Sequence, residues 1–289
     1  MSSITERAML VDLTIKQWTA AKHDRKVSHE VAQMHGSDAS MGRYHKLLIG
    51  REALEQLRQI ATAAGQEHRR RTLPWLDNGA RILSAEGYFG YTEVMRGFES
   101  QWEPALDAFV RDYPDYVDEA RHKLNGLYRS EDYPPVQCVR DRFAFGYNVF
   151  PLPSQQDFRV QLGDAETARV QASIEEQVNQ ALDAAMKEVW ERVRDVVGHM
   201  AERLHAYTVS ADGVSGAFRD SLVQNVRDLV DILPSLNIRN NPAVAEFTER
   251  MRAELCSYSP QTLRCSKAAR ERTAAAAEDI LSRVQAYAA

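Results

Sequence analysis

The feature that most constrains the fold is a helical pattern that begins near Asp164 and continues to Tyr207. The stretch contains no proline, and its only glycine is Gly198. Apolar side chains recur in steps of 4, 4 and 3 residues, an eleven-residue repeat that keeps one stripe on a nearly straight helix. We therefore predict a single helix about 65 Å long, at 1.5 Å per residue. The stripe consists of Ile174, Val178, Leu182, Ala185, Val189, Val193, Val196, Met200, Leu204 and Tyr207.

An apolar stripe of this length must be covered by another surface. Periodicity predicts further helices over 214–233, 242–257 and 267–286, with boundaries marked by Pro234, Asn241-Pro242 and Ser259-Pro260. These helices could cover the stripe within the same chain, and this bundle is the more economical arrangement. A second subunit could cover it as well, so both interpretations stay open.

The first half of the chain has a mixed pattern. Alternation of apolar and polar residues predicts strands over 11–15, 143–149 and 158–162, which would form a small antiparallel sheet. Periodicity near 3.6 predicts helices over 24–35, 43–70, 86–112 and 115–128. The aromatic residues concentrated between 88 and 116 are expected to form the core of this part. The fold class is therefore mainly α (α+β), with domains over 1–163 and 164–289.

The charge of the chain is distributed unevenly. The net charge is −5, yet residues 1–71 hold 12 Lys and Arg against 8 Asp and Glu. An acidic nucleic acid would therefore meet the basic N-terminal segment rather than the acidic middle, unless the basic ends pack against that middle. No apolar run approaches the roughly 20 residues that span a bilayer, so we expect no membrane partner.

The motifs of common enzyme classes are absent from the sequence. The chain has neither a GxxxxGK[ST] nor a GxGxxG phosphate loop, and neither a GxSxG elbow nor an HExxH helix. We therefore predict no catalytic residue and no cofactor. The best metal candidate is His199, Glu202 and His205, but the two histidines lie six residues apart and so point in different directions on a helix. Polar residues beside the apolar stripe are the better explanation of this set.

The segment EHRRRTLPW, residues 67–75, allows two interpretations. Arg69–Arg71 fall in the last turn of a predicted helix, where each cation stabilises the helix dipole by about 0.3–1 kcal/mol. The end of the helix explains two of these arginines well. A third arginine beside His68 leaves nucleic-acid binding open, because such binding needs several cations together and an aromatic ring for stacking. The candidate contacts are Lys46, Arg51, Arg58, Arg69, Arg70, Arg71 and Trp75.

Three segments resemble a known family. These are AMLVDLTIKQWTAAKHDRKVSHEV, HRRRTLPWLDNGARIL and the DYP…FPLPSQQDFRVQL region, which together cover residues 8–165. The order and the residues of these segments resemble those of a phage and prophage family of unknown function, the domain of unknown function 3150 group. The resemblance implies a phage-encoded accessory protein in the cytoplasm of a bacterial host. It also implies a MoxR/CobS-like AAA+ ATPase as a partner, and it transfers no catalytic residue.

These observations favour a non-enzymatic, phage-type accessory protein that makes protein–protein contacts through its long helical surface. The partner would be a second copy of the chain or an AAA+ ATPase. The alternative is a DNA- or RNA-binding accessory protein that uses the basic segment around Arg69–Arg71. An enzyme whose site is assembled from distant residues is the third hypothesis.

Overall fold

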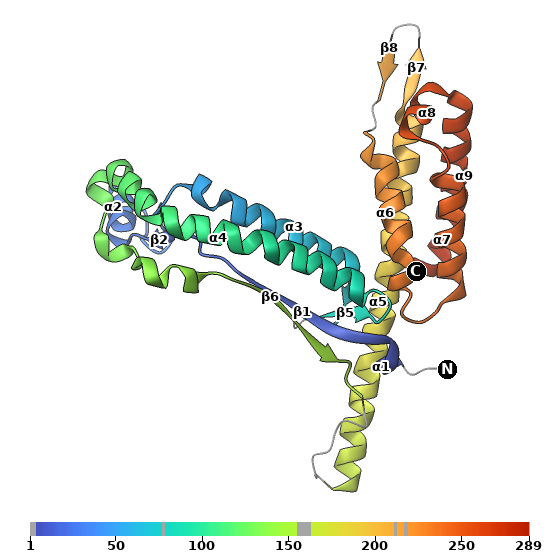
Figure 1. The fold of residues 1–289 in the computed structure, drawn as a ribbon, viewed down its shortest axis with the longest axis horizontal. Helices are drawn as coiled ribbons and strands as arrows, with labels where there is room; N and C mark the ends of the chain where they lie inside the picture. Colours follow the sequence, from blue (N-terminus) through green and yellow to red (C-terminus); the bar gives the residue numbers. More distant parts are fainter. Residues whose placement is uncertain (1–3, 77–78, 155–162, 211–212, 217–218, 289) are drawn as a thin grey trace. The chain divides into compact units, whose positions relative to one another are not determined.

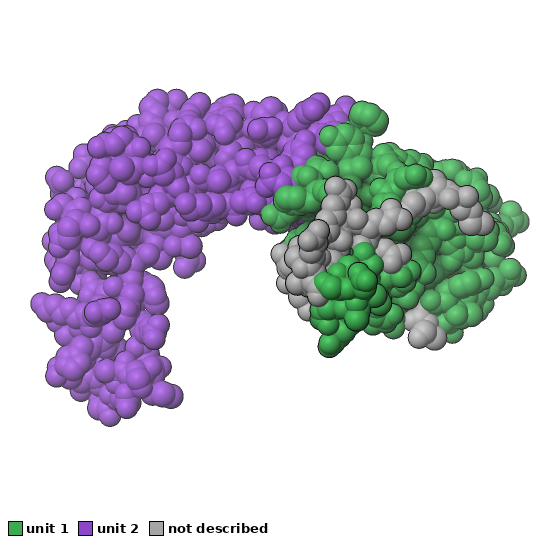
Figure 2. Space-filling view, turned by 90° about the horizontal axis from the view of Figure 1, so that it is seen from below, with its two compact units in different colours: residues 1–12, 69–91, 149–289 green, residues 13–68, 92–148 purple. Residues whose placement is uncertain are grey.

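The computed structural model describes residues 4–76, 79–154, 163–210, 213–216 and 219–288 (Figure 1). The chain is 70% helical and carries a small antiparallel sheet, so the predicted mainly α (α+β) class is confirmed. It divides into two compact units, which are coloured separately in Figure 2. Unit 1 comprises residues 1–12, 69–91 and 149–289, and unit 2 comprises residues 13–68 and 92–148.

This division differs from the sequential domains over 1–163 and 164–289 expected from the sequence. The difference arises because short N-terminal segments pack against the long C-terminal helix. Ala8, Leu10, Leu73 and Ile82 belong to the same buried cluster as Leu182 and the rest of the apolar stripe. Segments far apart in the chain therefore share one core in unit 1.

A helical bundle makes up most of unit 1 (Figure 1). The long helix α5 covers Asp164–Ala206 and is continuous for 43 residues, as the eleven-residue repeat predicts. It packs against α9 and α6, while α7 packs against both of those helices. Asn241 and Ser259 cap α7 and α8 by accepting hydrogen bonds from backbone amides of the first turn. The bounds are Ser221–Leu236 for α6, Pro242–Leu255 for α7, Pro260–Cys265 for α8 and Lys267–Ala288 for α9.

A four-stranded sheet has the order β4-β5-β1-β6. Strand β1 pairs antiparallel with β5, with Ala8 opposite Ser84 and Val11 opposite Arg81. The strands β1 and β6 confirm two of the predicted strands, whereas the third, over 158–162, lies outside the described residues. A hairpin of β7 and β8 follows α5. The bounds are Ala8–Lys16 for β1, Leu73–Pro74 for β4, Arg81–Ser84 for β5, Ala144–Pro151 for β6, Thr208–Ser210 for β7 and Gly213–Ser215 for β8, and the short α1 is Ile4–Arg7.

Unit 2 is built around residues 55–68 of α3 and residues 92–124 of α4. Its helix α2 follows the sequence signals closely: Asp24 accepts from the amides of Lys26 and Val27, and Gly36 ends the helix with φ of 60°. The bounds are Arg25–His35 for α2, Glu55–Arg71 for α3, Tyr88–Leu124 for α4, Ala21–His23 for β2 and His45–Leu47 for β3. Short 3₁₀ turns are η1 Arg51–Leu54, η2 Asn125–Leu127, η3 Ser130–Asp132, η4 Val136–Cys138 and η5 Arg140–Arg142.

Aromatic rings fill the core of unit 2, which confirms the prediction for residues 102–113, whereas Phe89 is 79% exposed. Trp102, Phe109 and Phe143 are buried together, with the rings of Phe109 and Phe143 5.4 Å apart. Tyr113 is buried beside them and donates its hydroxyl hydrogen to the carbonyl oxygen of Pro134 at 3.1 Å. Burial raises the pKa of Tyr113 to about 12, so this hydroxyl remains a donor at neutral pH.

Four predicted helices have different bounds in the structure. The helix expected over 43–70 begins only at Glu55, because β3 pairs with β2 and η1 follows it. The helices expected over 86–112 and 115–128 form one helix, α4, which continues through Pro114. The helix expected over 214–233 begins at Ser221 and includes Pro234, since the β7–β8 hairpin takes up the start of the segment.

The burial of α5 predicts a sharp contrast between two substitutions on the same helix. Leu204 is 2% exposed, so Leu204→Ala should lower the free energy of unfolding by about 2–5 kcal/mol through lost burial and a cavity. Ile174→Ala removes a half-exposed side chain and should cost clearly less. Urea unfolding followed by circular dichroism measures both. Equal costs would contradict the assignment of Leu204 to the core.

Candidate anion-binding and interaction sites

The end of helix α3 presents a cluster of arginines in unit 1. The helix ends at Arg71, just before Leu73-Pro74, because a residue that precedes proline is disfavoured in the helical region. The last carbonyl groups of a helix lack partners within the helix and must find donors elsewhere. At the end of α3, the carbonyl groups that find a donor outside the helix are those of Arg69, Arg70 and Thr72.

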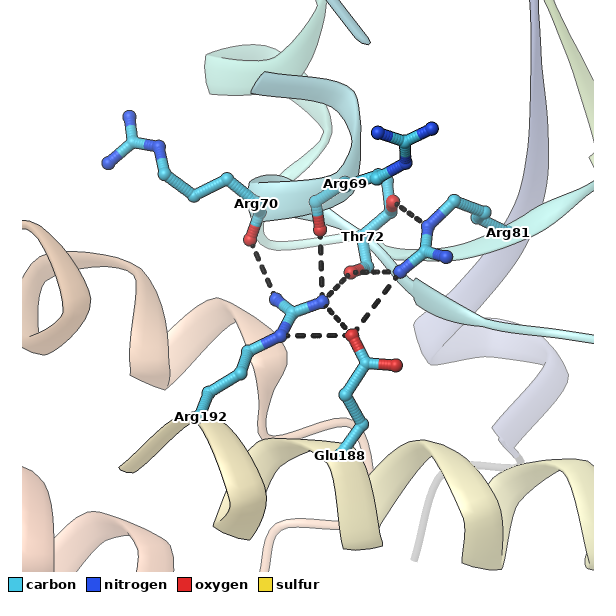
Figure 3. A network of polar contacts seen from close by, with 6 residues as sticks. All are labelled: Arg69, Arg70, Thr72, Arg81, Glu188 and Arg192. Carbon is cyan, nitrogen blue, oxygen red and sulfur yellow. Dashed lines mark hydrogen bonds and ion pairs between the residues drawn. The ribbon is translucent and has the colours of Figure 1, made fainter. Parts of the chain in front are cut away.

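A guanidinium group from α5 caps these carbonyls (Figure 3). Arg192 Nη1 donates to the carbonyl oxygen of Arg70 at 2.9 Å. Its Nη2 donates to the carbonyl oxygens of Arg69 and Thr72 at 3.0 and 2.8 Å. The fixed fork of a guanidinium group suits several acceptors at once, and its positive charge stabilises the negative end of the helix dipole. Arg192, from a distant part of the chain, therefore caps the end of α3, while Arg69–Arg71 lie in the last turn of the helix as predicted.

One carboxylate joins this cap to the sheet. Glu188 Oε1, one turn before Arg192 on α5, accepts from Arg192 Nε at 3.0 Å and contacts Arg81 Nη2 at 3.5 Å. Arg81, on β5, also donates to the hydroxyl oxygen of Thr72 at 2.7 Å and to its carbonyl oxygen at 3.2 Å. Burial lowers the pKa of Arg81. The positive charges of Arg192 and Arg69 lower this pKa further, whereas the negative charge of Glu188 raises it.

The cluster carries more positive than negative charge. The residues drawn in Figure 3 include four arginines but only one carboxylate, and Arg71 follows directly in the chain. Arg69 is exposed, whereas Arg70 and Arg71 are half-buried. Figure 3 shows the side chains of Arg69 and Arg70 leading away from the capped carbonyls. Trp75 is half-buried and packs against the core of unit 1, which leaves part of its ring accessible.

The other three residues of the predicted nucleic-acid site belong to unit 2. Arg51 is exposed, and Arg58 donates to its carbonyl oxygen at 3.4 Å. Lys46 exposes only 2% of its side chain. It is therefore not available to a nucleic acid, because a phosphate cannot reach its ammonium group.

Lys46 instead belongs to a buried ionic network. Its Nζ lies 2.6 Å from Asp132 Oδ2 and 3.4 Å from Asp24 Oδ2. It also donates to the carbonyl oxygen of Leu127 at 2.7 Å. Lys22 Nζ contacts the other oxygen of Asp132 at 2.5 Å, so two lysines hold one carboxylate. Burial raises the pKa of Asp132. Lys22 and Lys46 outweigh this effect and keep the pKa of the carboxyl below its usual value.

The predicted interaction stripe is divided by the structure into two parts. From Leu182 onward the stripe packs within unit 1 against α6 and α9. Val196 is only partly buried, and its neighbour Val197 is completely buried instead. The buried positions are not accessible to another chain. They are Leu182, Val189, Val193, Met200 and Leu204.

The first part of the stripe is different. No residue of α5 from 164 to 180 is buried, and in Figure 1 this part of the helix continues beyond the ends of α6 and α9. Its half-exposed residues lie on one face, since their spacing follows the helical period. They are Thr167, Val170, Gln171, Ile174 and Val178. This face is in line with the buried stripe: Val178 packs partly against the core of unit 1, and the face remains partly open from Ile174 toward Thr167.

The weak metal candidate is not assembled. His199 and Glu202 are exposed, and His205 Nε2 lies 2.8 Å from Oε1 of Glu278, on α9. In the part of the chain that the structure describes, no group of three or more His, Cys, Asp or Glu side chains is arranged to hold a metal ion. His205 therefore serves as a surface hydrogen-bond partner of Glu278.

Comparisons with protein-family models, with curated proteins and with solved structures found no match to this chain. The geometry of the sites described above therefore carries the functional argument. Over the described ranges, no helix is both long and apolar enough to cross a membrane. We consequently consider the exposed face of α5 and the arginine cluster as the two candidate surfaces.

The cap provided by Arg192 can be tested by substitution. Arg192→Ala leaves three carbonyl groups, two of them in part-buried hydrogen bonds, without this donor and should lower the free energy of unfolding by about 1–3 kcal/mol. Arg192→Lys should recover only part of this loss, because an ammonium group lacks the planar fork. The matched control is Arg194→Ala, an exposed arginine on the same helix, which should change stability by less than about 0.5 kcal/mol. Thermal unfolding measures all three, and equal effects at 192 and 194 would contradict the capping role.

Proposed function

We propose that this chain is a non-enzymatic interaction protein that binds a second copy of itself through the open face of residues 164–180 of α5. The observation that carries the proposal is the change along one helix: the apolar stripe is buried from Leu182 onward but half-exposed at Ile174 and Val178. Isolated apolar positions on a surface are ordinary, whereas a stripe in line with a core is suited to a further helix.

The spacing of this face favours a second copy as the partner. Thr167, Gln171, Ile174 and Val178 are separated by steps of 4, 3 and 4 residues, which read the same in both directions along the helix. Two antiparallel copies can therefore place these positions opposite one another around a twofold axis, with each Ile174 near the partner's Gln171. Because two of the four positions are polar, we expect a weak, concentration-dependent dimer.

The family resemblance adds a heterologous partner to this proposal. It implies a phage-type accessory protein that works with a MoxR/CobS-like AAA+ ATPase. Residues 164–180 carry four carboxylates and one arginine, so a basic helix of such a partner would also be complementary to this segment. Self-association and binding of an ATPase would then compete for the same face.

Sedimentation equilibrium over a range of protein concentrations tests self-association. The wild-type chain should dimerise as its concentration rises. The double variant Ile174→Glu/Val178→Glu should weaken the dimer by at least about tenfold, because each copy would bury two charges. The control Ala172→Glu/Ser173→Glu adds the same charge at exposed positions of the same segment and should dimerise like the wild type within about threefold. A wild-type chain that stays monomeric, or an equal effect of the control, would refute the proposal.

A second candidate function is the binding of DNA or RNA by the arginine cluster. The specific observation in its favour is that Arg69 is exposed and Arg70 half-buried at a helix end whose carbonyl groups Arg192 caps. Their guanidinium groups can contact phosphates bidentately, and the partly exposed ring of Trp75 can stack on a base. The four arginines drawn around Glu188 in Figure 3 would add attraction for a negatively charged nucleic acid.

Fluorescence anisotropy with labelled duplex DNA and single-stranded RNA over a salt series tests the second function. Arg69→Ala/Arg70→Ala should weaken binding and reduce the salt slope by up to about 2 for duplex DNA, since each lost phosphate contact contributes about 0.9. The matched control is Arg203→Ala/Arg272→Ala, which removes two exposed arginines elsewhere in unit 1. Absence of binding at about 50 mM salt, or an equal effect of the control, would exclude this function.

A further inference from the structure

The buried ionic network of unit 2 lies at an open hollow of about 590 Å³. Five cationic side chains line it, from β2, α2, β3 and the segment just before η3. They are Lys22, Arg25, Lys26, Lys46 and Arg129. Three carboxylates line the same hollow: Asp24, Glu131 and Asp132. With His23 counted as neutral, the lining has a surplus of two positive charges.

Two of the three carboxylates in the lining, Asp24 and Asp132, have partners within the protein itself. Asp132 lies between Lys22 and Lys46, and Asp24 accepts from the amides at the start of α2. The amide of Val27 has the largest effect in lowering the pKa of Asp24, and Lys46 adds to it against the effect of burial. Both carboxylates are therefore ionised at neutral pH, and their charge is already compensated.

The cations at the hollow are less fully engaged. Arg25 and Arg129 are exposed, and among the described residues neither of their side chains forms a hydrogen bond or an ion pair. Lys26 contacts Glu30 only at 3.8 Å and keeps 73% of its side chain exposed. These three side chains are free to rotate toward a ligand in the hollow, whereas Lys46 is fixed.

Two other uses of the hollow do not fit its geometry. Lys46 is an improbable nucleophile, because its amine is held between Asp132, Asp24 and the carbonyl oxygen of Leu127. A divalent cation would have to displace lysines from both carboxylates, and the surplus positive charge opposes it. A bound anion, in contrast, gains from the surplus charge without disturbing the network.

We propose that this hollow binds a small phosphate-bearing anion, a phosphate monoester. The surplus of two charges matches a phosphate dianion, and Arg25 and Arg129 offer the paired donors that phosphate oxygens accept. The volume exceeds that of a phosphate ion, so the hollow also has room for the organic part of an ester. The amides at the start of α2 are taken by Asp24, so the binding groups are side chains rather than the helix end. This proposal involves unit 2 only and does not depend on self-association through α5.

Isothermal titration calorimetry of the full chain tests this site at constant ionic strength. The probes are glycerol phosphate and inorganic phosphate, which distinguish an ester site from a site for the free ion. Glycerol phosphate should bind the wild-type chain. Arg25→Ser/Arg129→Ser should raise its dissociation constant at least about tenfold, because two charge-assisted contacts are lost. Tighter binding of inorganic phosphate than of the ester would overturn the assignment to an ester.

The control variant is Arg96→Ser/Arg142→Ser, which removes two exposed arginines of unit 2 that do not line the hollow. It changes the net charge by the same amount and should bind glycerol phosphate with an affinity within about twofold of the wild type. Since all four arginines are exposed, the thermal unfolding midpoints of both variants should match that of the wild type. No binding to the wild-type chain at millimolar ligand, or equal weakening in the control, would overturn the proposal.

Discussion

Burial of one face of α5 organises unit 1, because the other helices and the N-terminal strand segments all reach the same apolar surface. Helices α6 and α9 contact α5 directly, and Leu73 and Ile82 join the same buried cluster. Burial contributes roughly 25 cal/mol per Å² of apolar area, so a continuous stripe outweighs any single ion pair in this unit. The helix is long enough to serve this core and still continue beyond it.

The same helix also provides the polar connection to the end of α3. Glu188 and Arg192 lie one turn apart on a half-buried face of α5, beside the buried stripe. Their side chains hold Arg81 and the carbonyl groups at the end of α3. The buried apolar face thus fixes the position of α5. From that position, Arg192 on the neighbouring polar face can donate hydrogen bonds to the carbonyl groups at the end of α3. The exposed position of Arg69 depends on this arrangement.

The sequence predicted the elements whose signals are local. The continuous helix predicted from the repeat along α5 and the helix predicted over 24–35 are confirmed, because each depends on neighbouring residues. Contacts with distant parts decided the rest. Pro114 disfavours a helix locally, yet α4 continues through it between the buried side chains of Tyr113 and Ala120. The strands β4 and β5 were missed because both are short and are recognisable mainly by their pairing.

The candidate sites could be predicted only in part. A sequence shows how many charged residues a segment has, but not which of them are exposed after folding. Lys46 and Arg69 belong to the same basic segment, yet one is buried between carboxylates and the other is exposed. Two of the contacts that bury Lys46, to Leu127 and Asp132, come from residues 81 or more positions away, which no spacing rule reaches. Both anion-binding proposals therefore depend on which cations stay exposed after folding: Arg69 in unit 1, and Arg25 and Arg129 in unit 2. A chain with a net charge of −5 can bind anions at such places because the field near a site is set by its nearest charges.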